Sequence, residues 1–185
     1  MSVFTTHTAE TAPAAARRAI EGVRGRFGWL PSAVALIAES PQLLNGFLAA
    51  SAGFEQTSLA PVEREVVIMA LSTSHECHFC VALHTGKITE IGASAALITA
   101  LRAGTTLPEP RLEALRQFTL AVLKHRGAVP DEELEAFLAV GYQPRQALDV
   151  VLGVGAYTMS TFANRLTRAP LDPPLAAHAW TPPVS

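Results

Sequence analysis

The chain contains few of the residues that mark several large classes of protein. Among its 185 residues are 2 cysteines, 2 tryptophans and 2 tyrosines, and only 16% of the residues are charged. Two cysteines are too few for the disulfide framework of a small secreted domain. A net charge of −2 without a basic cluster provides no nucleic-acid footprint and no polybasic membrane patch. We therefore expect neither nucleic acid nor a membrane as a partner.

Targeting signals and long apolar runs are also missing. The N-terminal stretch MSVFTTHTAETAPAAARRAI has no basic segment followed by an apolar one, as a secretory signal would have. The least charged segment, residues 150–164, is too short to span a bilayer. These features predict a cytoplasmic protein, and in that compartment paired thiols are more often catalytic or metal-binding than structural.

The hydrophobic residues, 49% of the chain, are spaced as in helices. Val, Ile and aromatic residues do not alternate as strands require, so the sequence predicts an all-α fold. We expect one domain over residues 1–185, with a motif core at about 60–92. Helices are predicted at residues 14–27, 32–39, 41 onward, 61–73, 76–91, 94–103, 108–126, 130–140 and 144 onward.

Two features near the C-terminus lead to further expectations. The last helix is apolar on most sides, which places it in the centre of the fold or at a subunit interface, and Gly153 and Gly155 would let another backbone approach it closely. From Ala169 onward five prolines interrupt the chain. Because proline cannot continue a helix, we predict an extended tail over residues 169–185 that lies on the surface or on a neighbouring subunit.

Both cysteines lie in one stretch, REVVIMALSTSHECHFCVALHTGKITEIG, together with three of the six histidines. In a helix, Cys77, Cys80 and His84 occupy positions i, i+3 and i+7 and share one face. A thiol at the start of a helix is favoured as a thiolate, and a nearby imidazole can accept its proton. On this argument alone Cys77 is slightly favoured as the nucleophile, with the second thiol as its resolving partner.

The spacing of the two thiols suits redox chemistry. A thiolate that attacks a peroxide becomes a sulfenic acid, which stays reversible when a second thiol condenses with it. A neighbour three residues away can close that disulfide with little backbone movement. The same pair also serves thiol–disulfide exchange with another protein or cofactor.

Three other interpretations of the cysteines are less favoured. A thioredoxin motif would lie beside a βαβ pattern, which is absent. A zinc site would use Cys77, Cys80 and His84 with His75 or His78, but no second ligand pair follows elsewhere in the sequence. Buried, inert cysteines are common, but they would not need a histidine one turn later.

The segment EVVIMALSTSHECHFCVALH resembles the signature of the alkylhydroperoxidase D-like branch of the carboxymuconolactone decarboxylase family: a glutamate followed twelve residues later by C-x-x-C-x-x-x-H. Weaker resemblance extends over RFGWLPSAVALIAESPQLLNGFL, LAPVEREVV and FANRLTRAPLD. The resemblance implies a compact all-α orthogonal bundle that assembles as a homo-oligomer, with active sites near subunit contacts.

The resemblance also implies a role for each motif residue. Cys80 would be the peroxide-reacting thiolate, Cys77 the resolving thiol, His84 the relay histidine, and Glu65 the carboxylate that acts through it. No metal, haem or flavin cofactor is needed, and the reductant would be a lipoyl or thioredoxin-like thiol. This chain departs from its relatives at Phe79, where many have tyrosine or histidine.

Four residues of the motif region need separate interpretation. Glu63 is typical of helix-start chemistry. Glu65 is followed by Val66, Val67 and Ile68, so it should be buried and need a partner, for which His84 is the natural candidate. His75 stands where many relatives have asparagine, and the sequence leaves open whether His75 and His78 line the pocket mouth or are simply exposed.

The expected function is thus a thiol-dependent peroxidase or disulfide reductase that reduces hydroperoxides through a Cys77/Cys80 dithiol–disulfide cycle. A carboxymuconolactone decarboxylase-like lyase is the alternative from the non-redox branch of the family, which does not depend on a cysteine pair. A helical oligomer whose thiols sense redox state without turnover is the non-enzymatic alternative.

Overall fold

The computed structural model describes residues 3–182, and over that range it is all-α, with no β-strand. The described residues form nine α-helices and one 3₁₀ helix. In chain order they are α1 (Ala14–Phe27), α2 (Ser32–Ile37), α3 (Pro41–Glu55), α4 (Pro61–Ser74), α5 (His78–Glu90), α6 (Ala95–Ala103), α7 (Pro110–Lys124), α8 (Asp131–Ala139), α9 (Pro144–Thr167) and η1 (Pro173–His178).

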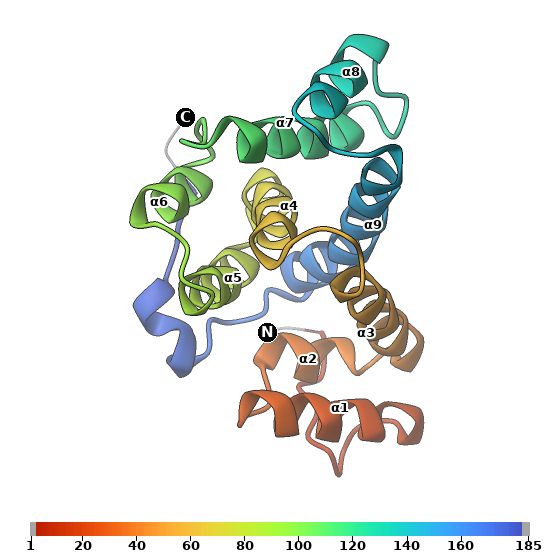
Figure 1. The fold of residues 1–185 in the computed structure, drawn as a ribbon. Coiled ribbons are helices and arrows are strands. Elements are labelled where there is room, and N and C mark those ends of the chain that lie inside the picture. Colours follow the sequence, from red (N-terminus) through yellow and green to blue (C-terminus); the bar gives the residue numbers. More distant parts are fainter. Residues whose placement is uncertain (1–2, 183–185) are drawn as a thin grey trace.

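Helix α4 lies in the middle of the molecule (Figure 1) and packs against α5, α6, α7 and α9. Its residues 66–72 are all buried, as expected for a helix that is apolar on every side. Helix α3 packs along α9, α1 and α2 lie together at one end of the molecule, and α8 lies beyond α7 (Figure 1). No described helix combines the length and the apolarity needed to cross a lipid bilayer.

Side-chain caps accompany the predicted starts of α3 and α4. The Ser40 hydroxyl accepts the Leu43 N–H at 3.3 Å, and Glu63 accepts the Ala60 N–H at 2.8 Å, which is the helix-start role predicted for Glu63. Several predicted bounds are wrong. Helix α2 ends at Ile37 rather than at residue 39, α5 begins at His78 rather than at residue 76, and α7 covers Pro110–Lys124 rather than 108–126. Helix α7 begins at Pro110 because a residue before proline disfavours helical dihedrals.

Helix α9 buries one face and exposes the other. Gly153 lies on the buried face, where an added Cβ would come within 2.7 Å of the Phe54 ring, so its close neighbour is a side chain and not a backbone. Gly155 is exposed and has nothing within 4 Å of that position. The predicted backbone approach is therefore wrong within the chain.

The predicted extended tail is also wrong, because residues 173–178 form the 3₁₀ helix η1. Its two prolines occupy the first positions, where an N–H has no intrahelical partner to lose. The segment packs on α5 of its own chain, and Leu175 is buried. Beyond it, the Trp180 indole donates to the Arg102 carbonyl at 2.8 Å. The last part of the predicted tail, residues 183–185, lies outside the described residues.

Candidate active site

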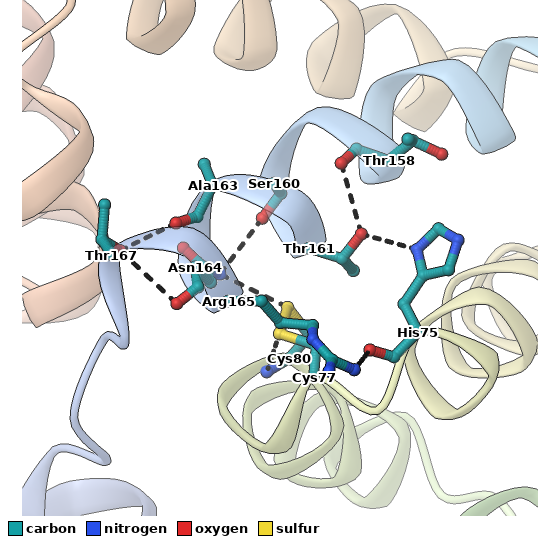
Figure 2. Close-up of a disulfide and its surroundings, with 10 residues drawn as sticks. All are labelled: His75, Cys77, Cys80, Thr158, Ser160, Thr161, Ala163, Asn164, Arg165 and Thr167. Atoms are coloured by element: carbon teal, nitrogen blue, oxygen red, sulfur yellow. Dashed lines mark hydrogen bonds between the residues drawn. A yellow bond between two sulfur atoms is a disulfide. The ribbon is translucent and has the colours of Figure 1, made fainter.

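The two cysteines lie at the junction of α4 and α5. The sequence predicted that Cys77 belongs to the first turn of this helix. Helix α5 begins at His78, however, so Cys77 is its N-cap. The Cys77 sulfur accepts the Cys80 N–H at 3.4 Å, and the two sulfurs are joined as a disulfide with their Cα atoms 5.3 Å apart (Figure 2). Both residues are buried. The helix start therefore holds the two thiols in bonding positions.

Helix α9 fixes the turn that leads into the cysteine pair. Glu76 has a φ of 51°, in the left-handed region. The Arg165 guanidinium donates to the His75 carbonyl (Figure 2) and forms an ion pair with the Glu76 carboxylate at 3.2 Å. The turn before Cys77 is thus held by a contact from a helix far away in sequence.

His84 and Glu65 form a buried pair that joins α5 to α4. The Glu65 Oε2 accepts a hydrogen bond from His84 Nδ1 at 2.7 Å, and the two side chains are only 12% and 5% exposed. The predicted contact between these residues is therefore present. With its proton on Nδ1, a neutral His84 has a lone pair on Nε2 that can accept another proton.

Burial and pairing set the charges of the two groups. Burial is the largest influence on His84 and lowers its pKa, against the opposing charge of Glu65, so the ring is neutral at neutral pH. Burial alone would raise the pKa of Glu65, but the charge of and hydrogen bond from His84, with smaller effects of Lys87 and Arg64, leave it below its usual value. We take the resting pair as an ionised carboxylate and a neutral imidazole.

Tyr157 of α9 packs against the His84 imidazole. The edge-to-face contact between the two rings has a centroid distance of 5.4 Å, and the Tyr157 hydroxyl lies 3.2 Å from the Ser51 hydroxyl. Burial raises the pKa of Tyr157 to about 12, so the phenol stays protonated and uncharged at neutral pH.

A cavity of about 90 Å³ lies between the N-terminal helices and α5 and α9. Cys80 and His84 both line it, whereas Cys77 is absent from its described lining. The remaining lining is mostly apolar and includes Val23, Phe27, Val34, Ile37, Phe47, Leu48, Phe79, Leu83 and Tyr157. The cavity is thus a small apolar chamber with a thiol and an imidazole in its wall.

A larger, more polar groove of about 730 Å³ adjoins this cavity. The two share Arg26, Phe27, Glu55, Leu83 and Lys87 in their walls. The Arg26 guanidinium and the Glu55 carboxylate are 3.0 Å apart and largely exposed. This ion pair therefore lies where the outer groove meets the inner cavity.

Asn164 of α9 is a site residue that the sequence reasoning missed. Its side-chain N–H donates to the Cys80 sulfur at 3.3 Å (Figure 2), and the residue is 4% exposed. The only sequence signal was an amide on an apolar helix, two helical turns after Tyr157 and on the same face. Such an amide needs partners when buried, but its sequence position does not identify them.

The other two histidines of the motif differ in environment. His78 is exposed on the first turn of α5. His75 is half-buried, its Nδ1 lies 2.8 Å from the Thr161 hydroxyl (Figure 2), and its ring packs on Phe162. Burial, with the charge of Arg165, lowers the pKa of His75. In the described part of the chain, no three or more His, Cys, Asp or Glu side chains are grouped to hold a metal ion.

Together, the fold and the site describe an all-α protein with a redox-capable cysteine pair beside a histidine–carboxylate pair. Residues 38–119 match the model of the carboxymuconolactone decarboxylase family. This matched segment contains Glu65, Cys77, Cys80 and His84, the residues on which the predicted resemblance to that family rests. Among curated proteins, no sequence matches it significantly.

Solved structures that share the fold include the following three. The alkylhydroperoxidase AhpD core of an uncharacterized peroxidase-related protein from Ralstonia eutropha JMP134 has a TM-score of 0.82 at 21% identity, with 94% of each chain covered. A peroxidase-related protein from Silicibacter sp. TM1040 has a TM-score of 0.78 at 17% identity, covering 94% of this chain and 93% of that one. The debrominase Bmp8, as its C82A variant with 2,3,4-tribromopyrrole, has a TM-score of 0.75 at 14% identity, with 96% of each chain covered.

Proposed function

We propose that the chain is a thiol peroxidase that reduces small hydroperoxides through a Cys77/Cys80 dithiol–disulfide cycle. Because a debrominase shares the fold, the fold alone does not determine the activity, and the argument must come from the site. One observation carries it: Cys80 and His84 line the same small cavity, with Glu65 behind His84 and Cys77 already in bonding position behind Cys80.

In the proposed reaction, neutral His84 accepts the proton of the reduced Cys80 thiol through Nε2. The thiolate attacks the terminal oxygen of the hydroperoxide, so that an S–O bond forms and the O–O bond breaks. The leaving alkoxide takes the proton from His84 and departs as an alcohol. This step leaves Cys80 as a sulfenic acid.

The second step forms the disulfide between Cys77 and Cys80. The Cys77 sulfur attacks the Cys80 sulfur, an S–S bond forms, and the hydroxyl leaves as water with the proton of the Cys77 thiol. Two thiols of an external donor then reduce the disulfide by exchange. A lipoyl or thioredoxin-like donor in a reducing, cytoplasmic compartment is the proposed source of those electrons.

The order of attack is proposed from the cavity. Cys77 receives the N–H of the helix start, which on that ground alone favours it as the thiolate. Cys80, however, is the thiol that shares the cavity with His84. In this proposal, access of Cys80 to the substrate and to the base His84 matters more than stabilisation of the Cys77 thiolate by the helix start. Cys80 therefore attacks the hydroperoxide and Cys77 resolves the sulfenic acid.

The size and lining of the cavity support a substrate class. A volume of about 90 Å³ is well below the roughly 300–1,000 Å³ of pockets for drug-sized ligands. Its mostly apolar wall favours a short alkyl hydroperoxide, with hydrogen peroxide as the smallest substrate that fits.

We also propose that the chain works as one domain in a homo-oligomer. Large apolar side chains are exposed along the outer face of α9, including Phe162 at 56% and Leu166 at 70%. Contiguous apolar surface of this kind marks association sites. These residues flank Asn164 and Arg165, so a contact there would lie beside the cysteine pair.

Turnover tests the proposal against its alternatives. The reduced chain is mixed with tert-butyl hydroperoxide and excess dihydrolipoamide, and alcohol formation is followed over many equivalents. A peroxidase keeps producing alcohol, whereas a redox sensor reacts once and stalls. The lyase alternative predicts conversion of a carboxymuconolactone by a Cys77→Ser/Cys80→Ser variant, and that result without hydroperoxide turnover would contradict the proposal.

A further inference from the structure

Asn164 places one amide against the sulfur that the proposed function treats as the nucleophile. Its Nδ2 donates to Cys80 Sγ at 3.3 Å and to Ser160 Oγ at 3.4 Å. Both amide hydrogens therefore have acceptors. A donor to sulfur stabilises the thiolate more than the thiol, because hydrogen bonds to a charged acceptor are stronger than those to a neutral one.

The other end of the same amide is unpartnered. Asn164 Oδ1 is buried and has no hydrogen-bond partner among the described residues. A buried carbonyl oxygen without a partner costs free energy, so such groups need an explanation when a fold retains them. Asn164 also lines the cavity of about 90 Å³ that contains Cys80 and His84.

We propose that Asn164 is a catalytic residue of the peroxide step, with a separate function for each end of its amide. The N–H stabilises the negative charge on Cys80, and Oδ1 accepts the O–H of the bound hydroperoxide. This inference rests on the proposed function, and it assigns to Asn164 the orientation of the hydroperoxide substrate.

The two contacts fit the atom balance of the reaction. The oxygen attacked by Cys80 is the one that bears the hydrogen, and after the O–O bond breaks that hydrogen remains on the sulfenic acid. Asn164 Oδ1 therefore holds the same hydrogen before and after the step. The proton for the leaving alkoxide comes from His84, which received it from the Cys80 thiol, so the two residues handle different protons.

Five other charged or titratable side chains line the cavity together with Cys80. They are His84 and Lys87 from α5, Arg26 from α1, Glu55 from α3 and Tyr157 from α9. None is altered by a substitution at position 164, so a change in the pH profile of Cys80 would report on the amide itself.

The test uses the full-length chain with Cys77→Ser, so that the oxidised Cys80 cannot be resolved. Two rates are measured from pH 5 to pH 10: alkylation of Cys80 by iodoacetamide, and sulfenic acid formation with tert-butyl hydroperoxide. Asn164→Leu removes both contacts at similar volume, Asn164→Asp keeps the shape but introduces a carboxylate, and Ser160→Ala removes only the hydroxyl neighbour of the amide.

For Asn164→Leu we expect the midpoint of alkylation to move to higher pH. We also expect peroxide oxidation to fall about tenfold to a hundredfold at neutral pH, the effect of losing a hydrogen bond to a charged group. Part of that loss should remain at pH values above the alkylation midpoints of all variants, because Oδ1 is still missing. Asn164→Asp should raise the midpoint further, and Ser160→Ala should change neither rate by more than about twofold.

The outcomes separate this inference from the proposed function. If the Cys77→Ser chain with Asn164 intact forms no sulfenic acid, the peroxidase proposal itself fails. If it does, but Asn164→Leu or a folded Asn164→Asp reacts at the same rate and with the same midpoint, the assignment of Asn164 alone is wrong. Circular dichroism and the urea midpoint establish which variants are folded.

Discussion

The hydrogen bond between Glu65 and His84 makes the carboxylate the residue whose removal is most informative. In Glu65→Gln the side chain keeps its shape, and the amide oxygen can still accept a hydrogen bond from His84 Nδ1, which lies 2.7 Å from Oε2 in the unaltered chain. What is lost is the charge beside the ring. The imidazolium that forms when His84 takes the Cys80 proton would then lie buried without a counter-charge.

The size of the effect follows from the kind of hydrogen bond that is lost. Bonds to charged groups contribute about 1.5–3 kcal/mol and neutral ones about 0.5–1.5 kcal/mol, so folding stability should fall by only about 1–1.5 kcal/mol. The proton-transfer step should lose the full charged contribution. Oxidation of Cys80 should therefore slow roughly ten- to a hundredfold at neutral pH.

Stopped-flow measurement of Cys80 oxidation by tert-butyl hydroperoxide from pH 6 to pH 10 tests this expectation. The gap from the unaltered chain should narrow at high pH, where Cys80 ionises without help from His84. Glu63→Gln is the matched control, because Glu63 lies on the same helix but pairs with Arg111 and the Ala60 N–H. Equal effects of the two substitutions, or an unchanged rate in Glu65→Gln, would refute the reasoning.

Three further outcomes follow from the same structure. The free energy of unfolding should fall as the pH drops below 6.5, because unfolded His84 takes up a proton that the buried ring resists, and it should fall further below pH 4.5, where the Glu65 carboxylate is protonated. Urea titrations at several pH values should give a different dependence of this free energy on pH for the unaltered chain and for His84→Gln. The same pH dependence in both chains would exclude His84 as the cause. Gly153→Ala should lower the free energy of unfolding by about 1–3 kcal/mol, because the new Cβ would overlap the buried Phe54 ring. Gly46→Ala, with open space around the new Cβ, should raise it by up to about 1 kcal/mol. A stabilising effect of Gly153→Ala would contradict the packing. Arg26→Ala should increase the ratio of the rate with cumene hydroperoxide to the rate with tert-butyl hydroperoxide. Because the ion pair with Glu55 is exposed, the free energy of unfolding should change by no more than about 1 kcal/mol. An unchanged ratio of the two rates would mean that substrates enter elsewhere.

The sequence predicted most of the fold because helix signals are local. Serine and proline at Ser40–Pro41, and the glycine after α6 at Gly104, act within a few residues of where they stand. The contact between Glu65 and His84 was also predictable, since a glutamate followed by three apolar residues is expected to be largely removed from solvent and then needs a basic partner. Helical spacing then left few candidates.

Other parts of the site depend on contacts between distant segments, which spacing along the chain does not specify. Asn164 reaches Cys80 only because α9 crosses the start of α5. The inner cavity requires α1, α2 and α3 to close over His84. The tail was misjudged because proline excludes an α-helix interior but not the first positions of a 3₁₀ helix, which here follow Asp172.

The order in which the two thiols react tests the central claim most directly. Cys77→Ser and Cys80→Ser chains are fully reduced and treated with one equivalent of tert-butyl hydroperoxide in the presence of dimedone, and peptides are analysed by mass spectrometry. The account predicts a rapid dimedone adduct on Cys80 in Cys77→Ser and little or none on Cys77 in Cys80→Ser. A faster adduct on Cys77, or persistence of both free thiols in the unaltered chain, would contradict it.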